Sequence, residues 1–246
     1  AEQKVAIITG ASQGLGEAIL KGYRDRNWRV VANSRNIKPS TDPDVLTVAG
    51  DIGDPEVAER TVKQALGHFG RIDTLVNNAG ATKRGPFLDL SEDDWQDGFA
   101  LKFFGAVRLA RESWPHLKRT GGQVINIIGS GGRTPTAEFT IGGSVNAGLM
   151  NFTKALADQG LADGVRVNGI NPGPIRTERL ETRIRQFAQS HGIDTEEAAS
   201  RMVQAQKVMR FGEPEEIARA VIFLAADEAG FISGSTLSIN GGQHMS

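Results

Sequence analysis

Short apolar runs rich in β-branched residues alternate along the chain with longer segments in which apolar residues recur at helical spacing. Runs of the first kind are typical of strands buried on both faces, and segments of the second kind are typical of amphipathic helices. The alternation predicts an α/β fold with a doubly wound parallel sheet of about seven strands, in a three-layer α/β/α arrangement. The predicted strands cover residues 4–9, 29–33, 45–49, 72–76, 124–128, 165–170 and 236–239.

Several predicted helices begin with residues that satisfy the free amide groups of a first turn. Asp54 precedes a proline and a glutamate, which gives an N-cap, an N1 proline and a first-turn acid. Ser91 and Asp94 have the spacing of a capping box, which predicts the start of one long helix running toward His116. Other helices are expected after residue 16, over about 140–161 and over 213–226.

Length and composition narrow the possible classes of protein. The 246 residues suit one compact domain, so we expect a single domain over residues 1–246. The chain has 28 Lys and Arg against 29 Asp and Glu and carries neither a spanning apolar run nor a signal-peptide pattern. This balance argues against nucleic-acid and membrane partners and predicts a cytoplasmic protein. With no cysteine and only scattered histidines, no metal site is expected.

Ligands of such sheets bind at the carboxyl ends of the strands, so the loops there carry the candidate chemistry. Gly10, Gly14 and Gly16 lie between the first strand and the first helix, where backbone amides and the helix N-terminus can meet a pyrophosphate. A tight turn that needs positive φ is the alternative. The second strand ends in Ser34 and Arg35 rather than in an acid, and a guanidinium suits a 2′-phosphate. We therefore expect NADP(H) in preference to NAD(H), unless Arg35 is simply a solvated loop residue.

Four motifs together resemble the short-chain dehydrogenase/reductase family over essentially the whole chain. They are TGxxxGxG at residues 9–16, the pair Asp51-Ile52, NNAG at 77–80 and NPGPIRT at 171–177. The resemblance implies a Rossmann-type fold in which the second motif contacts adenine, the third lines the ribose and the fourth cradles the nicotinamide. It also implies a substrate-covering segment at about 176–210. The cofactor-binding candidates are Gly10, Ser12, Gln13, Gly14, Leu15, Gly16, Ser34, Arg35, Asp51, Ile52, Asn78, Ala79, Gly80, Ile128, Pro172, Gly173, Ile175 and Thr177.

The catalytic positions depart from that family's pattern of Asn, Ser, Tyr and Lys. Ser130 follows the fifth strand, as the family's serine does, although a serine there can also simply satisfy the glycine-rich loop. Aligning the helix after it puts Gly142 at the tyrosine position and Asn146 at the lysine position. The chain's single tyrosine, Tyr23, belongs to the first helix, beside the sheet. Gly142 and Gly143 are expected to widen the pocket, which would permit a bulkier substrate.

Lys102 stands where the family has asparagine, so the two changes are reciprocal. We interpret this as one ammonium kept in the same small volume but delivered from another helix. Lys102 would then be a proton donor or a ribose anchor, Ser130 would donate a hydrogen bond to the carbonyl, and Asn146 would hold a ribose hydroxyl or a relay water. The alternative is that Lys102 extends to solvent and that both differences are drift in an unused site.

These observations predict an NADP(H)-dependent oxidoreductase that transfers hydride to or from a carbonyl or alcohol substrate by a non-standard acid/base arrangement. A catalytically inactive NADPH-binding regulator or subunit, and a non-redox enzyme on the same fold, remain as alternatives. Near the substrate-covering segment, Arg176, Arg179, Arg183 and Arg185 make an anionic small-molecule substrate possible, although nearby glutamates could pair with them.

Assembly is expected from the predicted helix that runs toward His116 and from the helix predicted over about 140–161. Both are apolar over more than one stripe, which suggests burial against another subunit as well as against the chain's own core. The family resemblance implies a homotetramer or a homodimer.

Overall fold

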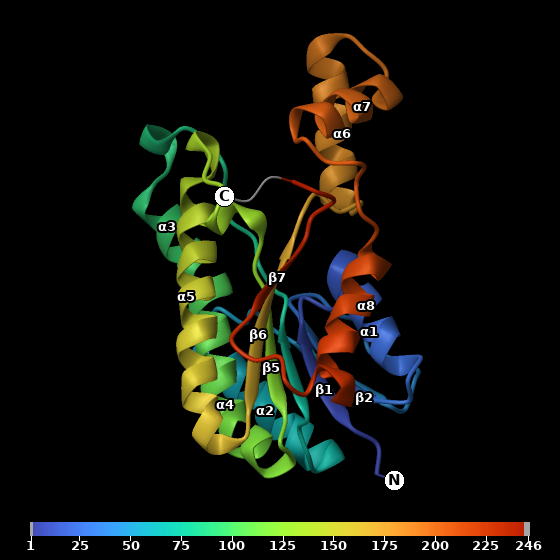
Figure 1. The fold of residues 1–246 in the computed structure, drawn as a ribbon, viewed down its shortest axis with the longest axis vertical. Coiled ribbons are helices and arrows are strands. Elements are labelled where there is room, and N and C mark those ends of the chain that lie inside the picture. The colour runs from blue at the N-terminus through green and yellow to red at the C-terminus, as the bar shows by residue number, and fades with distance from the viewer. Residues whose placement is uncertain (1, 244–246) are drawn as a thin grey trace.

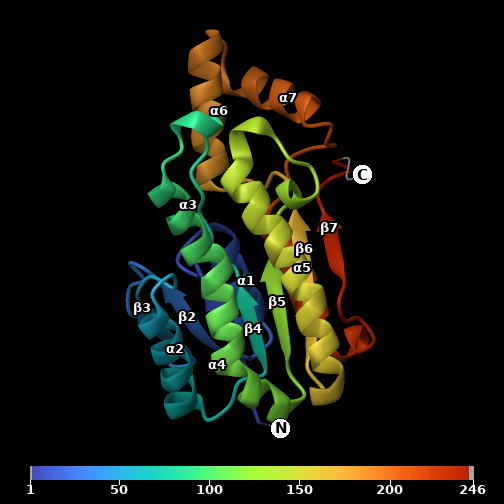
Figure 2. The ribbon, with the colours of Figure 1, turned by 90° about the vertical axis from the view of Figure 1, so that its left-hand side faces the viewer.

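A seven-stranded parallel sheet forms the centre of the computed structural model, which describes residues 2–243 (Figures 1 and 2). Residue 1 and residues 244–246, which the predicted domain includes, lie outside this range. The strand order is β3-β2-β1-β4-β5-β6-β7. The strands are β1 (Val5–Thr9), β2 (Arg29–Ser34), β3 (Val45–Ala49), β4 (Thr74–Asn77), β5 (Gln123–Ile127), β6 (Arg166–Pro172) and β7 (Thr236–Ile239).

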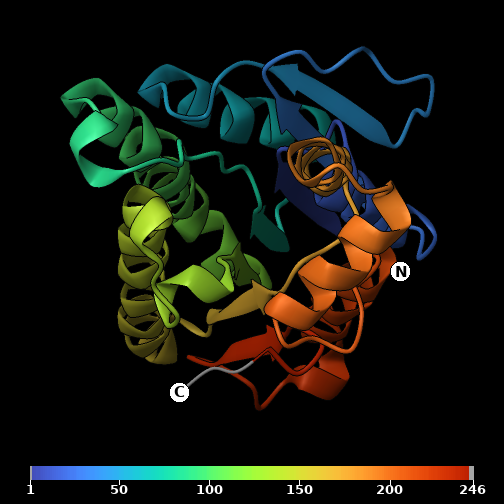
Figure 3. The same ribbon diagram turned by 90° about the horizontal axis from the view of Figure 1, so that it is seen from above.

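Helices cover both faces of this sheet, which confirms the predicted three-layer α/β class. Helices α1 (Gly14–Arg24) and α8 (Pro214–Ala225) pack on one face around Ile19, Tyr23 and Val221. Helices α2 (Pro55–Phe69), α4 (Gly105–Thr120) and α5 (Thr140–Asp163) cover the other face (Figure 3). The strand order reverses between β1 and β4, so a crevice opens at their carboxyl ends, as it does in doubly wound sheets that bind nucleotides.

The predicted long helix from Ser91 is interrupted, which corrects the sequence-based expectation. The capping box is present, because the Asp94 amide donates to Ser91 Oγ at 3.2 Å and the Ser91 amide to Asp94 Oδ2 at 2.9 Å. Helix α3 (Glu92–Gly98) then passes through a π-helical turn over Phe99–Phe104 before α4 begins. Such turns change which side chains face inward and often occur at functional sites. Lys102 lies within this one.

The polar segment at 176–210 folds into two helices that sequence periodicity did not predict. Helices α6 (Glu178–His191) and α7 (Thr195–Ala205) pack on each other around Leu180, Ile184 and Met202, as a small apolar cluster separate from the core. They stand beyond the carboxyl end of the sheet, above α8 and β7 (Figure 1). Their arginines and glutamates are therefore carried to the end where ligands of this fold bind.

Within residues 2–243, no helix is long and apolar enough to cross a membrane. The same range contains no group of three or more His, Asp or Glu side chains that could hold a metal ion.

Candidate active site

The glycine-rich loop after β1 borders a cavity of about 560 Å³. Gly10 and Gly14 have φ angles of +64° and +58°, which side chains rarely adopt. A Cβ atom added at Gly16 would lie 2.0 Å from the carbonyl oxygen of Gly10, so the first turn of α1 could not pack against the loop. At each of the three positions a side chain would therefore strain the backbone or clash with it, and the glycines allow the backbone itself to form the cavity wall.

The start of α1 can hold a phosphate. Its N-cap residue, Gln13, makes no hydrogen bond from its side chain to the first turn, and Gln13, Gly14 and Leu15 all line the cavity. Free amides of a helix N-terminus favour an anion. The loop after β4 is fixed beside them, because the amides of Asn78 and Ala79 both donate to Thr9 Oγ1, at 3.0 and 2.9 Å.

The end of β2 presents a cation at the same cavity. Asn33 is buried, and its side-chain Nδ2 donates hydrogen bonds to the carbonyl oxygens of Val48 at 3.0 Å and Gly50 at 3.2 Å. Ser34 and Arg35 line the cavity, and Arg35 is exposed. The end of β2 therefore places a serine hydroxyl and a guanidinium, and no carboxylate, at this part of the cavity wall.

The structure brings most of the predicted cofactor residues to this cavity and leaves others outside its lining. Asp51 Oδ1 accepts a hydrogen bond from the Gly53 amide at 2.8 Å. Ile128 offers its carbonyl to Lys102, and the Gly173 amide donates to the Ile239 carbonyl at 3.0 Å. The lining includes Gly10, Ser12, Gln13, Gly14, Leu15, Ser34, Arg35, Ile52, Asn78, Ala79, Gly80 and Thr177, whereas Gly16, Asp51, Ile128, Pro172, Gly173 and Ile175 are not part of it.

A second cavity, of about 290 Å³, is lined by Lys102 and Asn146, two of the three predicted catalytic residues. It shares Gly80 and Arg179 with the first cavity, so the two are continuous in their lining. Lys102 extends inward: its stem packs on Gly80, and its ammonium donates to the Ile128 carbonyl. Desolvation lowers the pKa of Lys102 from its ordinary 10.5 to about 8, with a smaller contribution from the positive charge of Arg179.

Asn146 lies in the same cavity and is 2% exposed. Its Oδ1 is buried and has no hydrogen-bond partner among the described residues, whereas its amide group lies against Gly129 and Gly131. A buried acceptor without a partner is costly and is suited to a ligand hydroxyl or a water. Ser130 begins a short turn over Ser130–Gly132 against α5 and is not among the lining residues of either cavity.

The space beside Gly142 is filled, which corrects the expectation of a widened pocket. A Cβ atom added at Gly142 would lie 2.0 Å from Cζ of Phe139, and one added at Gly131 would lie 2.9 Å from the same ring. The Phe139 ring therefore sits in a slot between two glycines. The Arg84 guanidinium lies 3.7 Å from the centre of this ring. Sequence reasoning missed both residues, although Phe139 is three positions before Gly142, where helical neighbours meet.

Tyr23 lies where it was predicted, far from this chemistry. It is fully buried in α1, with its ring centre 5.0 Å from that of Trp28, and burial raises the pKa of its hydroxyl.

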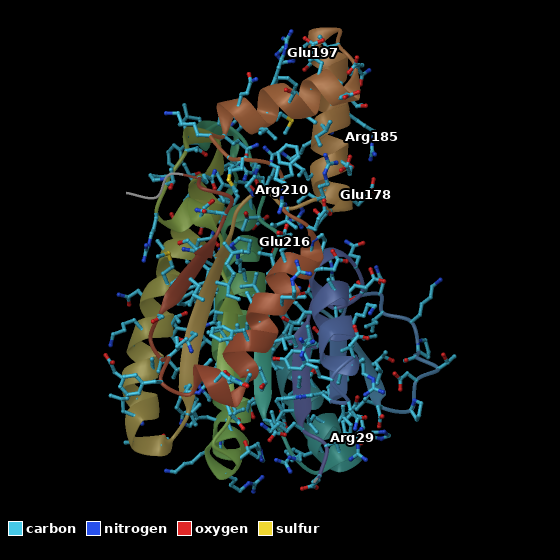
Figure 4. The ribbon with its side chains drawn as sticks, turned by 45° about the vertical axis from the view of Figure 1, so that its right-hand side comes forward. Arg29, Glu178, Arg185, Glu197, Arg210 and Glu216 are labelled. Atoms are coloured by element: carbon cyan, nitrogen blue, oxygen red, sulfur yellow. The ribbon has the colours of Figure 1, made fainter. Side chains whose placement is uncertain are left out.

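Of the four arginines predicted in the covering segment, two form ion pairs with glutamates and two line the smaller cavity. Arg176 pairs with Glu181 at 2.9 Å, and Arg185 pairs with Glu178 at 2.5 Å on the outer side of α6 (Figure 4). Arg179 and Arg183 instead line the smaller cavity, one helical turn apart. Arg84 reaches the same cavity from the loop after β4.

Fold and site together define a doubly wound α/β protein with a cationic pocket that adjoins the crevice at the carboxyl ends of the strands. Residues 10–244 match the family model described as enoyl-(acyl carrier protein) reductase. The chain is 35% identical to the acetoacetyl-CoA reductase of Shinella zoogloeoides over 98% of each protein. It is 33% identical to a 3-oxoacyl-[acyl-carrier-protein] reductase of Escherichia coli, covering 99% of this chain and 98% of that one.

Among solved structures, the chain resembles the L-sorbose reductase of Gluconobacter frateurii, complexed with NADPH and L-sorbose. The TM-score is 0.91 at 30% identity, with coverage of 98% and 97% of the two chains. The chain belongs to the short-chain dehydrogenase/reductase family of oxidoreductases.

Proposed function

We propose that this chain is an NADP(H)-dependent reductase that acts on a carbonyl or alcohol substrate with Lys102, rather than a tyrosine, as its proton donor. The observation that carries the proposal is the inward-facing ammonium of Lys102 in a cavity that adjoins the cofactor crevice. The relatives' activities support the reaction class, and the NADPH-complexed sorbose reductase supports the choice of cofactor.

The residues present fit NADP(H). The first turn of α1 would hold the pyrophosphate, Asn78 to Gly80 the ribose, and Arg35 the 2′-phosphate through charge-assisted hydrogen bonds. When bound, this cofactor supplies or accepts the hydride. The remaining chemistry falls to the chain, which must hold the substrate carbonyl, exclude water and deliver a proton to the new alkoxide oxygen.

Lys102 suits the last of these tasks. A lysine whose pKa is near 8 is protonated at neutral pH and still gives up its proton readily, which is what a general acid requires. A positioned proton donor of this kind contributes about 10²–10⁴-fold to a rate. Asn146 would accept a hydrogen bond from a ribose hydroxyl or a relay water through its free Oδ1. We assign Ser130 the role of hydrogen-bond donor to the substrate carbonyl, from its place after β5.

A catalytically silent NADPH-binding regulator is the second candidate, and one observation favours it. The Phe139 ring, which has no hydroxyl, occupies the slot beside Gly142. A site with an aromatic ring but no phenol would bind the dinucleotide without the family's usual proton transfer.

The experiment that separates the candidates measures NADPH binding and NADPH oxidation in the same preparations. Fluorescence titration gives the affinity, and absorbance follows turnover across a panel of ketones, aldehydes, oxo acids and imines. We expect turnover of at least one class, a loss of about 10²-fold or more in Lys102→Met, and a smaller loss in Ser130→Ala. Tight NADPH binding without turnover of any compound would contradict the reductase and favour the regulator.

We also propose a homo-oligomer assembled through α4 and α5. Phe104 is 46% exposed beside the partly buried Phe103 and Phe152, which leaves an apolar surface on this pair of helices. Light scattering of the purified chain would give the mass of a dimer or a tetramer, and a monomer would contradict the proposal.

A further inference from the structure

The smaller cavity collects positive charge without negative charge to balance it. Arg84, Arg179, Arg183 and Lys102 all line it, and none of the four forms an ion pair within residues 2–243. The acid whose charge acts on Arg84 is Glu138, an exposed residue on the neighbouring turn. No carboxylate is among the residues that line the cavity.

This excess is not a general property of the covering segment. Glu178 and Glu181 pair with two other arginines of the segment, Glu178 with Arg185 at 2.5 Å (Figure 4) and Glu181 with Arg176 at 2.9 Å. Arg185 on α6 therefore has a carboxylate partner, whereas Arg179 and Arg183 on the same helix line the cavity and form no ion pair within residues 2–243. Burial lowers the pKa of both Lys102 and Arg84, so holding these two cations without a counter-charge costs stability that an anionic ligand would offset.

The cations are close enough to act on one another. Burial, followed by the charges of Arg183 and Arg179, lowers the pKa of Arg84. The charge of Arg179 also helps to lower the pKa of Lys102. These groups come from three separate segments, which are the loop after β4, the π-helical turn and α6. An anion among them would relieve the repulsion of all these segments at once.

Arg84 is also oriented for recognition. Its guanidinium lies over the Phe139 ring at 3.7 Å, and its loop is fixed by the Gly85 amide, which donates to the Glu138 carbonyl at 3.1 Å. The Lys83 ammonium, paired with Asp94 at 2.9 Å, holds the other side of the same loop. Stacking uses the face of a guanidinium and leaves its N–H edges available for both oxygens of a carboxylate.

We propose that this cavity binds the carboxylate of a small oxo acid or hydroxy acid, with Arg84 and Arg183 as the residues that select it. The carboxylate would lie between these two guanidiniums at the outer end, and the oxo or hydroxyl group would lie inward toward Lys102. A cavity of about 290 Å³ limits the substrate to a small acid. The choice of an oxo acid rests on the proposed reductase function, whereas binding of the carboxylate does not require turnover.

The test compares each acid with its own uncharged ester. Calorimetric titrations with benzoylformate, levulinate and their methyl esters are run on the chain loaded with NADP⁺, which cannot reduce them, and again without cofactor. We expect each acid to bind at least about tenfold more tightly than its ester, since only the acid can accept charge-assisted hydrogen bonds from the guanidiniums. In the double variant Arg84→Gln/Arg183→Gln, that preference should fall below about threefold. In Arg183→Gln alone, it should fall between the values of the wild type and the double variant.

Arg185→Gln is the matched control, because it removes a charge from the same helix at a residue paired with Glu178, and it should leave the preference unchanged. Equal binding of acid and ester, no binding of either acid, or a preference that survives in the double variant would overturn the proposal. Acids that bind selectively but never oxidise NADPH would contradict the reductase function and leave the carboxylate site supported. The two failures are therefore distinguishable.

Discussion

Replacing Lys102 by methionine should make the folded chain more stable while it removes the proposed proton donor. Methionine keeps most of the volume of the lysine stem that packs on Gly80 but carries no charge. In the wild-type chain, burial lowers the pKa of Lys102 from 10.5 to about 8, so folding at neutral pH must place a charged ammonium where it is poorly solvated.

The size and sign of the effect follow from that pKa. A pKa lowered to about 8 means that the charged ammonium destabilises the folded state by about 3 kcal/mol, which the methionine variant avoids. The variant also loses the hydrogen bond to the Ile128 carbonyl, which costs it about 1 kcal/mol. Because the folded pKa lies below the unfolded one, the penalty is fully present below about pH 8. It disappears as the pH rises toward 10.5. At pH 7, Lys102→Met should therefore gain about 2 kcal/mol, or about 4–8 °C in Tm.

The assay is thermal and urea unfolding of both chains between pH 7 and pH 10.5. Lys154→Met is the matched control, because Lys154 is exposed on α5 and pairs with Asp158, so its removal should change stability by less than about 0.5 kcal/mol. The reasoning is refuted if Lys102→Met is less stable than the wild type at pH 7, or if the difference between the two chains does not shrink as the pH rises.

Two further substitutions test the cofactor crevice and the aromatic slot. Arg35→Ser should weaken NADPH binding by about 10–100-fold and leave NADH binding nearly unchanged, since a charge-assisted contact to the 2′-phosphate is lost. Arg26→Ser, in the turn that follows α1, serves as the control, and an equal loss for both cofactors would contradict the assignment. Gly142→Ala should cost about 1–3 kcal/mol, because its Cβ would lie 2.0 Å from the Phe139 ring. Gly67→Ala, where nothing lies within 4 Å, should be neutral or stabilising. In a Phe139→Ala background the cost at Gly142 should vanish, and a cost that persists would mean that the ring is not the obstacle.

The sheet could be predicted from the sequence because its strands are buried on both faces and therefore appear as continuous apolar runs. Strand β5 is buried at all five positions, and the capping box at Ser91 has its predicted partners. Helices α6 and α7 could not be predicted in this way. They bury only a small cluster around Leu180 and Met202 against each other, and their remaining surface is charged.

Most of the residues named for the cofactor line the larger cavity, and of the residues named for the chemistry Lys102 and Asn146 line the smaller one. Glycine spacing and the end of β2 are local signals, so the crevice residues could be named from the chain alone. The direction of Lys102 depends on a π-helical turn that no spacing rule identifies, and the slot around Phe139 requires two glycines, Gly131 and Gly142, from different segments. Arg84 was missed because its significance comes from unpaired arginines of α6 that lie far along the chain.

The pH dependence of NADPH oxidation, with the best substrate of the panel, tests the central claim most directly. If Lys102 donates the proton, kcat for reduction should be constant below about pH 8 and should fall about tenfold per pH unit above it. Lys102→Met should be about 10²–10⁴-fold slower at pH 7 and should not show this break. A variant that turns over at the wild-type rate, or a wild-type profile without a break near pH 8, would contradict the assignment of Lys102 as the acid.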